Sequence, residues 1–253
     1  MCAEGTEEFY FAKLANGWTV GRFAALDELA GLAHMVTTRQ GPDTEAARDD
    51  PAAAGEAIRG ELGVSSIAFC KQAHGNTILS PRSGGPAGKG DGLITTASSM
   101  ALMGLSADCP LILATDPVSG AVGLAHASWR GTVLKIASEL IVRMVGRYGA
   151  RPADIVACIC PSVGPCCYEV GPDVFQLASA SLGLRAEQFF EKRCGKTYFD
   201  LWAANVDELL EAGMPRENIH AAGICTVCRN DLFPSHRIEG ERAGRFVGVI
   251  ARL

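Results

Sequence analysis

The sequence predicts one globular domain in which α-helices and β-strands are mixed. Of its 253 residues, 48% are hydrophobic and 20% are charged, which is ordinary for a chain that buries a core. Strand-like apolar runs alternate with amphipathic helical segments, and no internal repeat is present. Because no low-complexity linker divides the sequence, we expect residues 1–253 to form a single domain.

Short apolar runs bounded by turn residues predict the strands. A buried strand is expected at 65–74, and the glycine- and proline-rich stretch 80–92 predicts a loop. Two strands, 101–116 and 120–128, are expected on either side of the turn DPVSG. Three further strands are expected within 153–164, at 218–224 and at 245–253.

Apolar residues spaced three and four apart predict the helices. Segment 132–150 predicts a helix that ends at Gly149, and two more are expected at 171–183 and 198–213. One face of the first helix carries six apolar residues: Leu134, Ile136, Leu140, Ile141, Met144 and Val145. Residues 39–62, rich in Asp, Ala and Gly, predict a variable loop or a solvated helix.

Charge and hydropathy exclude several classes of protein. The net charge of -5 and the isoelectric point near 5.6 argue against a general nucleic-acid binder. No apolar run reaches the ~18 residues that cross a bilayer, and the acidic stretch 1–18 lacks a signal-peptide pattern. We therefore expect a cytoplasmic protein that binds neither nucleic acid nor membranes. No pattern in the sequence indicates an oligomeric state.

The chain contains ten cysteines. Without a secretion signal a disulfide framework is disfavoured, so we expect most of them to be small buried hydrophobic residues. Cys225 and Cys228 form a CxxC pair, and CICPSVGPCC at 158–167 supplies more thiols. A zinc ribbon needs two CxxC knuckles and only one is present, so packing is the expected role of these cysteines.

Three residues stand where apolar runs meet polar turns: His74, Cys109 and His126. Two imidazoles and one thiolate suit Zn²⁺, and three protein ligands leave a fourth position for water or substrate. The separations of 35 and 17 residues match no local zinc motif, so the three strand-end positions carry the hypothesis. Taken alone, each residue is weak evidence, because a lone histidine is more often an ordinary core or surface residue than a metal ligand.

A second hypothesis makes Cys109 the nucleophile and His126 the base of a cysteine hydrolase. This chemistry needs an activated thiolate within hydrogen-bond reach of a histidine. It also needs an orienting Asn or Asp, whereas a zinc site needs His74 as its third ligand.

Several blocks appear in order along the chain and together resemble one family. The blocks are HMVTTR (34–39), KQAHGN (71–76), GDGLIT (90–95), SADCPLILATDP (106–117), GLAHASWRGT (123–132), PSVGPCCYEVG (161–171), YFDLWAANVDELLEAG (198–213), CTVCRNDLFPSHR (225–237) and AGRFVGVIARL (243–253). They resemble the polyphenol-oxidoreductase "laccase" family, formerly a domain of unknown function. Its members are described as purine nucleoside phosphorylases with adenosine deaminase activity.

The resemblance implies an α+β fold of four layers, α/β/β/α, with mixed β-sheets. It implies a zinc site, also catalytic, built from His74, Cys109 and His126, where copper is possible because it outcompetes zinc at most such sites. The implied activity is zinc-dependent phosphorolysis of adenosine, inosine or methylthioadenosine, together with adenosine deamination. The implied partners are a purine nucleoside and phosphate.

Arg130 is expected to bind substrate. It lies between Trp129 and Gly131, two residues before Thr132, where we expect a helix to begin. The positive end of that helix and the guanidinium would attract phosphate. The alternative is a surface arginine that covers Trp129.

Other residues are expected to support the site. Asp91, Gln72 and Tyr168 are substrate-binding candidates, and Glu169 and Arg237 are further candidates for the pocket. Asp91 and Asp108 are also expected to fix the tautomer of a ligand histidine.

The sequence departs from many relatives at two places. TTRQGPDTEAARDDPAAAG (37–55) replaces a turn with an SLNL-like stretch, so a substrate-contacting edge is expected to differ. Cys160 replaces a glycine, which makes that turn less permissive.

Two other activities stay open within this family resemblance. The first is amide hydrolysis by zinc or cysteine, for example of a peptidoglycan precursor. The second is copper-dependent polyphenol oxidation, which the sequence disfavours. A multicopper enzyme needs about ten histidines, many in HxH pairs, and this chain has five and no HxH.

Overall fold

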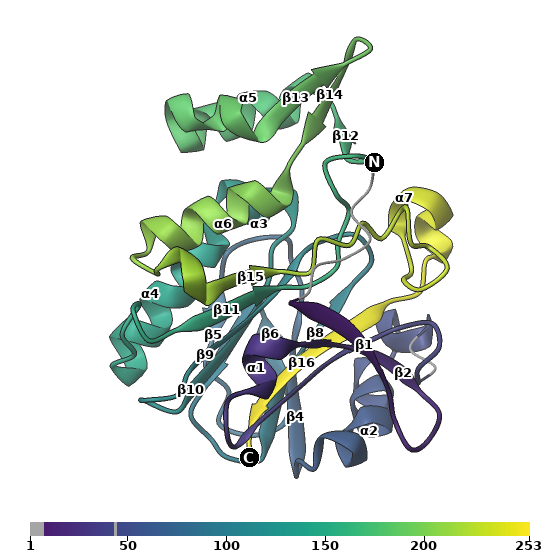
Figure 1. Cartoon of the computed structure of the whole chain (residues 1–253), viewed down its shortest axis with the longest axis vertical. Coiled ribbons are helices and arrows are strands. Elements are labelled where there is room, and N and C mark those ends of the chain that lie inside the picture. The colour runs from purple at the N-terminus through teal and green to yellow at the C-terminus, as the bar shows by residue number, and fades with distance from the viewer. Residues whose placement is uncertain (1–7, 43–44) are drawn as a thin grey trace.

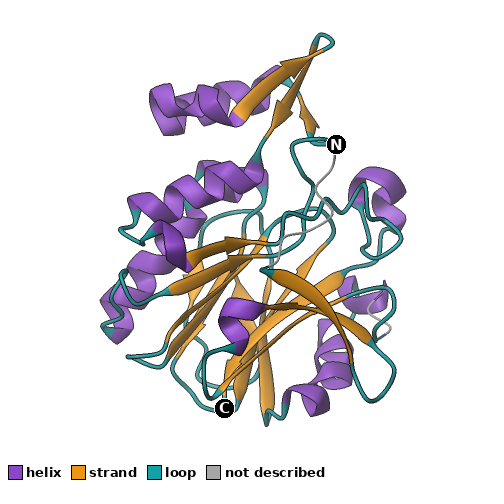
Figure 2. Cartoon of the chain, viewed as in Figure 1, coloured by secondary structure: helices purple, strands orange, loops and turns teal. Residues whose placement is uncertain are grey.

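The computed structural model describes residues 8–42 and 45–253, and two mixed β-sheets face each other at its centre (Figure 1, Figure 2). The seven-stranded sheet runs, in spatial order, β1 (Phe9–Lys13), β2 (Thr19–Phe23), β3 (Leu32–Thr37), β16 (Phe246–Arg252), β8 (Met100–Ser106), β4 (Ser66–Lys71) and β6 (Gly85–Lys89). The six-stranded sheet runs β15 (Ile219–Ala221), β11 (Val156–Ile159), β9 (Leu111–Asp116), β10 (Ala121–His126), β7 (Gly92–Thr95) and β5 (Ile78–Leu79).

Helices cover the outer face of each sheet. Helix α2 (Pro51–Leu62) packs on the seven-stranded sheet through one buried face. Helices α4 (Ile136–Tyr148) and α6 (Leu201–Glu211) pack on the six-stranded sheet. The largest apolar cluster lies between the two sheets. This is the four-layer α/β/β/α arrangement with mixed sheets that the family resemblance implied.

The two sheets approach closely at a pair of glycines. Gly104 in β8 lies opposite Gly248 in β16. A Cβ atom at Gly104 would lie 2.7 Å from Leu124 Cδ2, and one at Gly248 would lie 2.8 Å from Leu111 Cδ1. Both leucines belong to the other sheet, so the missing side chains make room for its apolar residues.

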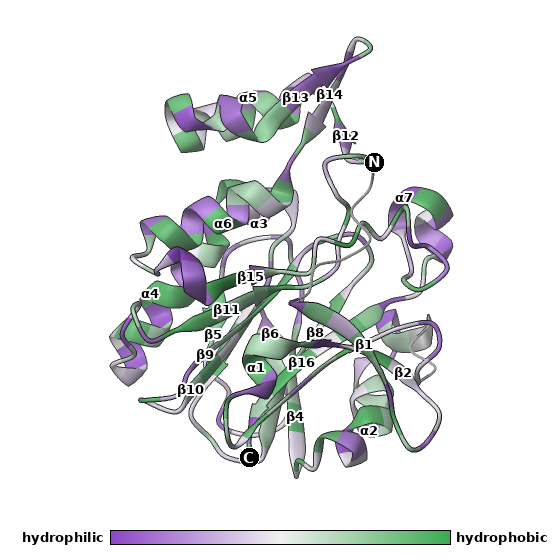
Figure 3. Ribbon diagram, viewed as in Figure 1, coloured by the Kyte–Doolittle hydropathy of each residue, from purple (hydrophilic) through white to green (hydrophobic). Residues whose placement is uncertain are grey.

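A smaller unit stands apart from the sheets in Figure 1. It contains β12 (Glu169–Val170), α5 (Pro172–Leu182), the 3₁₀ segment Gly183–Phe189, β13 (Phe190–Arg193) and β14 (Lys196–Phe199). Its apolar residues form one cluster with Val133, Leu201 and Ala204 of the neighbouring helices, whereas the β13–β14 hairpin is largely hydrophilic (Figure 3). The remaining short helices are α1 (Ala24–Asp27), α3 (Trp129–Val133), α7 (His236–Glu239) and the 3₁₀ turns Glu45–Arg48, Arg216–Asn218 and Gly240–Arg242.

The helix expected at 132–150 is two helices. The Ser128 side chain accepts a hydrogen bond from the Gly131 N–H at 3.1 Å, so α3 begins at Trp129, earlier than the apolar spacing predicts. Lys135, with φ of 61°, then separates α3 from α4. Gly149 ends α4 as expected.

The same break changes the predicted helical face. Ile136, Leu140, Ile141 and Met144 are buried, whereas Leu134 is 51% exposed and Val145 is 37% exposed. Leu134 lies before the break, so it does not follow the periodicity of α4.

The strand expected at 101–116 is also two elements. The chain leaves the seven-stranded sheet after Ser106 and enters the six-stranded sheet at Leu111. Every residue of both strands is buried, so the apolar run shows no alternation that would reveal the change of sheet. The crossing, residues 107–110, contains Cys109.

Two segments differ from their predictions, one expected as a loop and one as a variable loop or a solvated helix. The loop expected at 80–92 contains β6, which pairs in parallel with β4. The 39–62 segment contains α2, in which Ala54, Ile58 and Leu62 are buried rather than solvated. Residues 43 and 44 of this segment lie outside the described residues.

Replacing Leu140 should destabilise the protein far more than replacing Leu134. Leu140 is fully buried under the six-stranded sheet, so Leu140→Ala should lower the free energy of unfolding by about 2–5 kcal/mol. The exposed Leu134→Ala control should change it by less than ~1 kcal/mol. Urea unfolding measures both, and equal losses would contradict the division into α3 and α4.

Candidate metal centre

The structure brings His74, Cys109 and His126 together from three segments of the chain. His74 follows β4, Cys109 lies in the crossing between the sheets, and His126 ends β10. One ligand atom from each lies within 4.8 Å of the others. The two imidazole rings have centroids 5.2 Å apart at an angle of 73°. Such a cluster of two nitrogens and one sulfur has the composition of an open zinc site.

Backbone hydrogen bonds hold these segments at one edge of the sheets. The His126 N–H donates to the Asp91 carbonyl at 2.7 Å, and the Ala127 N–H donates to the Pro110 carbonyl at 2.8 Å. The end of β10 is therefore tied both to the segment before β7 and to the crossing that carries Cys109.

The carboxylate of Asp91 organises the two histidines. It accepts hydrogen bonds from the N–H groups of Ala73 (3.1 Å), His74 (2.9 Å) and Gly75 (2.8 Å), and it lies 3.2 Å from Nδ1 of His126. This contact engages Nδ1 and leaves Nε2 of His126 for another partner. Asp91 is 1% exposed and is not part of the cavity wall, so it serves the histidines rather than a substrate.

Two residues of the site have left-handed backbone conformations. His74 has φ of 57°, and Asp108, which precedes Cys109, has φ of 87°. Non-glycine residues with positive φ are uncommon and costly, and they concentrate at sites where geometry matters more than local stability. The three N–H bonds to Asp91 hold the His74 turn in this conformation.

Charge interactions shift the pKa values of Cys109 and His126 in opposite directions. Burial raises the pKa of the Cys109 thiol, but the interactions with His126 and His74 outweigh it and lower that pKa to about 7. Burial lowers the pKa of His126, but Cys109 and Asp91 outweigh it and raise that pKa to about 9. The metal-free pair therefore favours a thiolate beside an imidazolium near neutral pH.

The pKa of Asp91 is held below its usual value. Burial raises it, and the hydrogen bonds from His126, Gly75 and His74 more than offset that effect. The carboxylate therefore stays charged behind His126 at neutral pH.

The three residues open onto a cavity of about 1190 Å³ with a basic wall. Six basic side chains line it against two acidic ones, although the whole chain carries a net charge of -5. The basic residues are Arg48, Lys71, Lys89, Arg130, Arg237 and Arg245. A cavity of this size and charge suits a ligand that is itself an anion or that binds together with phosphate.

Arg130 lines this cavity and also covers Trp129. Its guanidinium lies 4.3 Å from the centroid of the Trp129 ring, as the alternative expected, and substrate binding by Arg130 stays a prediction. The helix begins at Trp129 rather than Thr132, so Arg130 lies within its first turn.

Gln72, Tyr168 and Arg237 line the cavity as expected. Gln72 donates its amide to the Leu105 carbonyl at 2.9 Å. The Arg237 guanidinium lies 5.2 Å from the Tyr168 ring, and burial raises the pKa of Tyr168. Glu169 is not part of the wall, since its carboxylate pairs with Lys196 at 2.7 Å.

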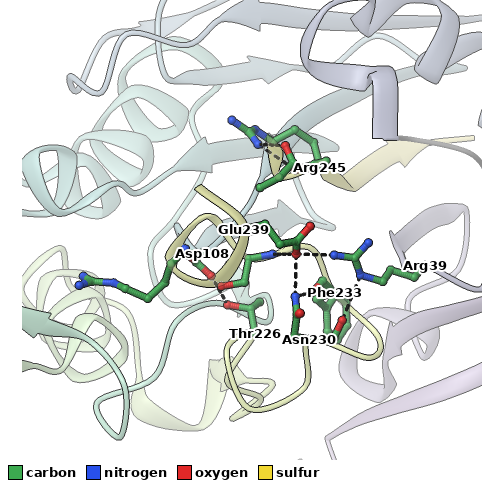
Figure 4. A network of polar contacts seen from close by, with 11 residues as sticks. Arg39, Asp108, Thr226, Asn230, Phe233, Glu239 and Arg245 are labelled. Carbon is green, nitrogen blue, oxygen red and sulfur yellow. Dashed lines mark hydrogen bonds and ion pairs between the residues drawn. The ribbon is translucent and has the colours of Figure 1, made fainter. Parts of the chain in front are cut away.

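Asp108 does not hold a histidine, contrary to expectation. Its carboxylate accepts hydrogen bonds from Thr226 Oγ1 at 2.6 Å and from the Arg237 N–H at 2.7 Å. It therefore connects the crossing to the segment that leads into α7. Figure 4 shows this contact beside the one in which Glu239 accepts hydrogen bonds from Arg39 and Asn230.

Sequence reasoning missed Arg48 and Arg245 as wall residues. Arg48 ends the 3₁₀ turn before α2, and Arg245 precedes β16. Both line the same cavity, and burial together with the charge of Arg48 lowers the pKa of Arg245. Two signals were available: Arg48 lies in the 37–55 segment expected to alter a substrate-contacting edge, and Arg245 stands just before an apolar strand in the block AGRFVGVIARL.

Cys160 fits its position without strain. It is buried, its N–H donates to the Leu111 carbonyl at 2.8 Å, and it is not among the described residues with positive φ. Replacing the glycine of relatives therefore needs no special backbone conformation here.

Comparison with known proteins defines the family. A profile of the family described as "Multi-copper polyphenol oxidoreductase laccase" matches residues 38–253, and the chain belongs to this family. The chain superposes on the crystal structure of YlmD from Geobacillus stearothermophilus with a TM-score of 0.82 and 29% identity, covering 96% of this chain and 98% of that one.

Two curated relatives carry names of nucleoside enzymes. A purine nucleoside phosphorylase of Bacteroides thetaiotaomicron is 35% identical over 166 residues, 63% of this chain and 60% of that protein. Adenosine deaminase RL5, from an unknown prokaryotic organism, is 35% identical over 161 residues, 63% of this chain and 61% of that protein. The alignments thus span about 60% of the length of these relatives.

The helices of the described residues are too short or too polar to cross a membrane. The cytoplasmic location stays a prediction from the sequence.

Asp91→Asn should lower both the pKa of His126 and the affinity for metal. In the metal-free protein, the folded-state pKa of about 9 exceeds the ordinary 6.5, so protonated His126 stabilises the fold at low pH. That contribution is fully present below pH ~6.5 and is lost as the pH rises through about 9. Because asparagine carries no negative charge, the pKa of His126 should fall, and the pH range over which protonated His126 stabilises the fold should narrow. The affinity for zinc should fall roughly 10- to 100-fold.

Nitrogen NMR of the metal-free protein follows the His126 titration, and metal competition measures the affinity. Asp116→Asn is the control, because Asp116 is equally buried but accepts from Val118 in the β9–β10 turn. An unchanged His126 pKa in Asp91→Asn would contradict the assigned role.

Proposed function

We propose that this protein is a zinc-dependent purine nucleoside phosphorylase that also deaminates adenosine. The observation that carries the proposal is the cluster of His74, Cys109 and His126 opening onto a basic cavity. The names of the relatives, a purine nucleoside phosphorylase and an adenosine deaminase, supply the substrate class.

The residues present fit a zinc ion. His74, Cys109 and His126 offer two nitrogens and one sulfur within 4.8 Å, and Asp91 orients His126 with Nε2 left for a metal. Three protein ligands leave the fourth position for substrate. When bound, zinc would supply a Lewis acid that polarises a water or phosphate oxygen. Copper, which competes for such ligands, could occupy the same residues.

The cavity wall divides into parts suited to the two substrates. Arg130, Arg48 and Arg245 present guanidinium groups that can bind phosphate through charge-assisted hydrogen bonds. Phe69, Trp129 and Tyr168 add aromatic side chains against which a purine can pack. Phosphate held by the arginines would attack ribose C1′ as the bond to the purine breaks, which gives ribose 1-phosphate and free base.

Polyphenol oxidation by several coppers remains disfavoured. The chain has five histidines, and the described cluster at the cavity uses two of them with a single cysteine. This set suffices for one metal ion rather than for a trinuclear cluster with a further copper.

A cysteine hydrolase is the second candidate, and Asp91 specifically favours it. Asp91 orients His126, and His126 lowers the pKa of Cys109 to about 7, which is the order of residues in a Cys–His–Asp arrangement. Such a site would cleave amides, including one in a peptidoglycan precursor. His74 has no role in this mechanism, and that distinguishes the two candidates.

The deciding assay incubates the purified protein with adenosine, with and without phosphate, and separates the products. Phosphorolysis should release adenine and ribose 1-phosphate only when phosphate is present. Deamination should release inosine in both conditions. Absence of both products, together with amide cleavage, would replace the proposal by the hydrolase.

Replacing each ligand should remove zinc and activity together. His74→Ala, Cys109→Ser and His126→Ala should each reduce the bound zinc at this site, because a tetrahedral site that lacks one ligand binds far more weakly. Elemental analysis and turnover are measured on the same samples, and chelation should abolish an activity that added Zn²⁺ restores. His74→Ala with substantial activity, or full turnover after chelation, would support Cys109 as a nucleophile.

Arg130→Ala should raise the KM for phosphate about ten- to a hundredfold, since a hydrogen bond to a charged group contributes ~1.5–3 kcal/mol. Zinc content should stay unchanged because Arg130 is not a ligand. Arg143→Ala is the control, because Arg143 is exposed on α4 and pairs with Glu139. An unchanged phosphate dependence in Arg130→Ala would leave Arg130 as cover for Trp129.

A further inference from the structure

A second cluster of sulfur atoms lies on two adjacent loops. Cys166 and Cys167 follow β11, and Cys225 and Cys228 follow β15. The four Sγ atoms all lie within 4.8 Å of one another. Cys228 Sγ is 3.8 Å from Cys166 Sγ and 3.4 Å from Cys167 Sγ.

Backbone pairing holds the two loops in register. Ser162 and Cys225 form a parallel bridge, in which the Ser162 N–H donates to the Ile224 carbonyl at 3.1 Å. The Thr226 N–H donates back to the Ser162 carbonyl at 3.0 Å. Each loop then turns, through a Tyr168 N–H bond to Gly164 and an Arg229 N–H bond to Cys225. This pairing therefore brings the cysteines of the two loops close together.

The absence of a side chain at Gly164 allows this close approach. A Cβ atom there would lie 3.2 Å from Cys225 Cβ and 2.7 Å from the Trp202 ring. The Gly164 N–H donates to Cys225 Sγ at 3.3 Å. A backbone donor on sulfur stabilises a thiolate, because hydrogen bonds favour the charged form that they contact.

The sulfur spacing matches a tetrahedral zinc site. Zinc binds thiolate at about 2.3 Å, which in a regular tetrahedron puts the sulfur atoms about 3.8 Å apart. The measured separations of 3.8 and 3.4 Å lie at or slightly inside this value, and none of the six exceeds it by more than about an ångström.

We propose that these four cysteines bind a second Zn²⁺ as a closed structural site in the reduced protein. Cys228 is disulfide-bonded in the structure, whereas Cys166, Cys167 and Cys225 are free thiols. Zinc binding therefore requires that a dithiol first reduce the disulfide of Cys228. The dithiol is oxidised to its own disulfide, and the protein disulfide becomes two thiols. Each ligand thiol then releases one proton as it bonds to zinc. This proposal replaces the packing role that the sequence predicted.

A closed four-thiolate site would hold part of the cavity wall. Tyr168, which lines the cavity, directly follows Cys167, and Thr226, which bonds Asp108, directly follows Cys225. The net charge of such a site is −2, and a cation lies beside it, since Arg193 Nη2 donates to the carbonyl of Pro165, the residue before Cys166. The second zinc would thus stabilise the wall without touching substrate.

The first test counts zinc in protein reduced with a dithiol under anaerobic conditions. Wild type should hold two zinc ions per chain. His74→Ala should keep only the zinc at the four cysteines, and Cys225→Ser should keep only the zinc at the histidine site. The exposed Cys194→Ser control should keep both. Because each variant removes only one site, absence of zinc from the site of His74 would leave the zinc count at the site of Cys225 unchanged. A full count of two in Cys225→Ser and Cys166→Ser would overturn the proposal.

The second test needs no variant and therefore does not depend on the folding of Cys225→Ser. Reduced wild type is alkylated with and without Zn²⁺, and the labelled peptides are quantified by mass spectrometry. Zinc should slow labelling of all four cysteines several-fold and leave Cys194 unchanged. Cobalt substitution of His74→Ala should give the strong thiolate-to-cobalt absorption of a four-sulfur site. Equal labelling with and without zinc, and no such absorption, would overturn the proposal.

Discussion

The buried carboxylate of Asp91 is the contact on which the candidate centre depends. A charge with 1% exposure is costly unless it is fully hydrogen-bonded, and here three backbone N–H groups and one imidazole satisfy it. Those donors come from the turn 73–75 and from the end of β10. One anion therefore holds the left-handed turn at His74 and sets the free nitrogen of His126.

The change of sheet at residues 107–110 places the third residue of the centre. The chain must cross between two packed sheets, and a crossing at their edge projects Cys109 toward the histidines. Asp108 anchors this crossing to Thr226 and to the start of α7. The cavity wall is then completed by basic residues from distant segments, which gives an acidic protein a cationic site. Such a local field attracts anions regardless of net charge.

Much of the fold followed from local patterns. The hairpin β9–β10, helix α6 and the terminal strand β16 lie where apolar spacing and turn residues predicted them. The patterns misplaced elements where burial was uniform or where backbone conformation decided the outcome. Both strands within 101–116 are buried along their whole length, so the division of this run between two sheets left no alternating signal. The break at Lys135 is a left-handed residue that no propensity favours.

The sequence by itself determined the chemistry available at the site: two imidazoles and one thiol at strand ends, a carboxylate before β7, and too few histidines for several coppers. The tertiary structure decided which of these groups meet. Asp91 faces a histidine whereas Asp108 does not, Arg48 and Arg245 join Arg130, and four cysteines from two loops form one cluster. Contacts between residues far apart in sequence arise from the packing of whole sheets, and no local pattern encodes that packing.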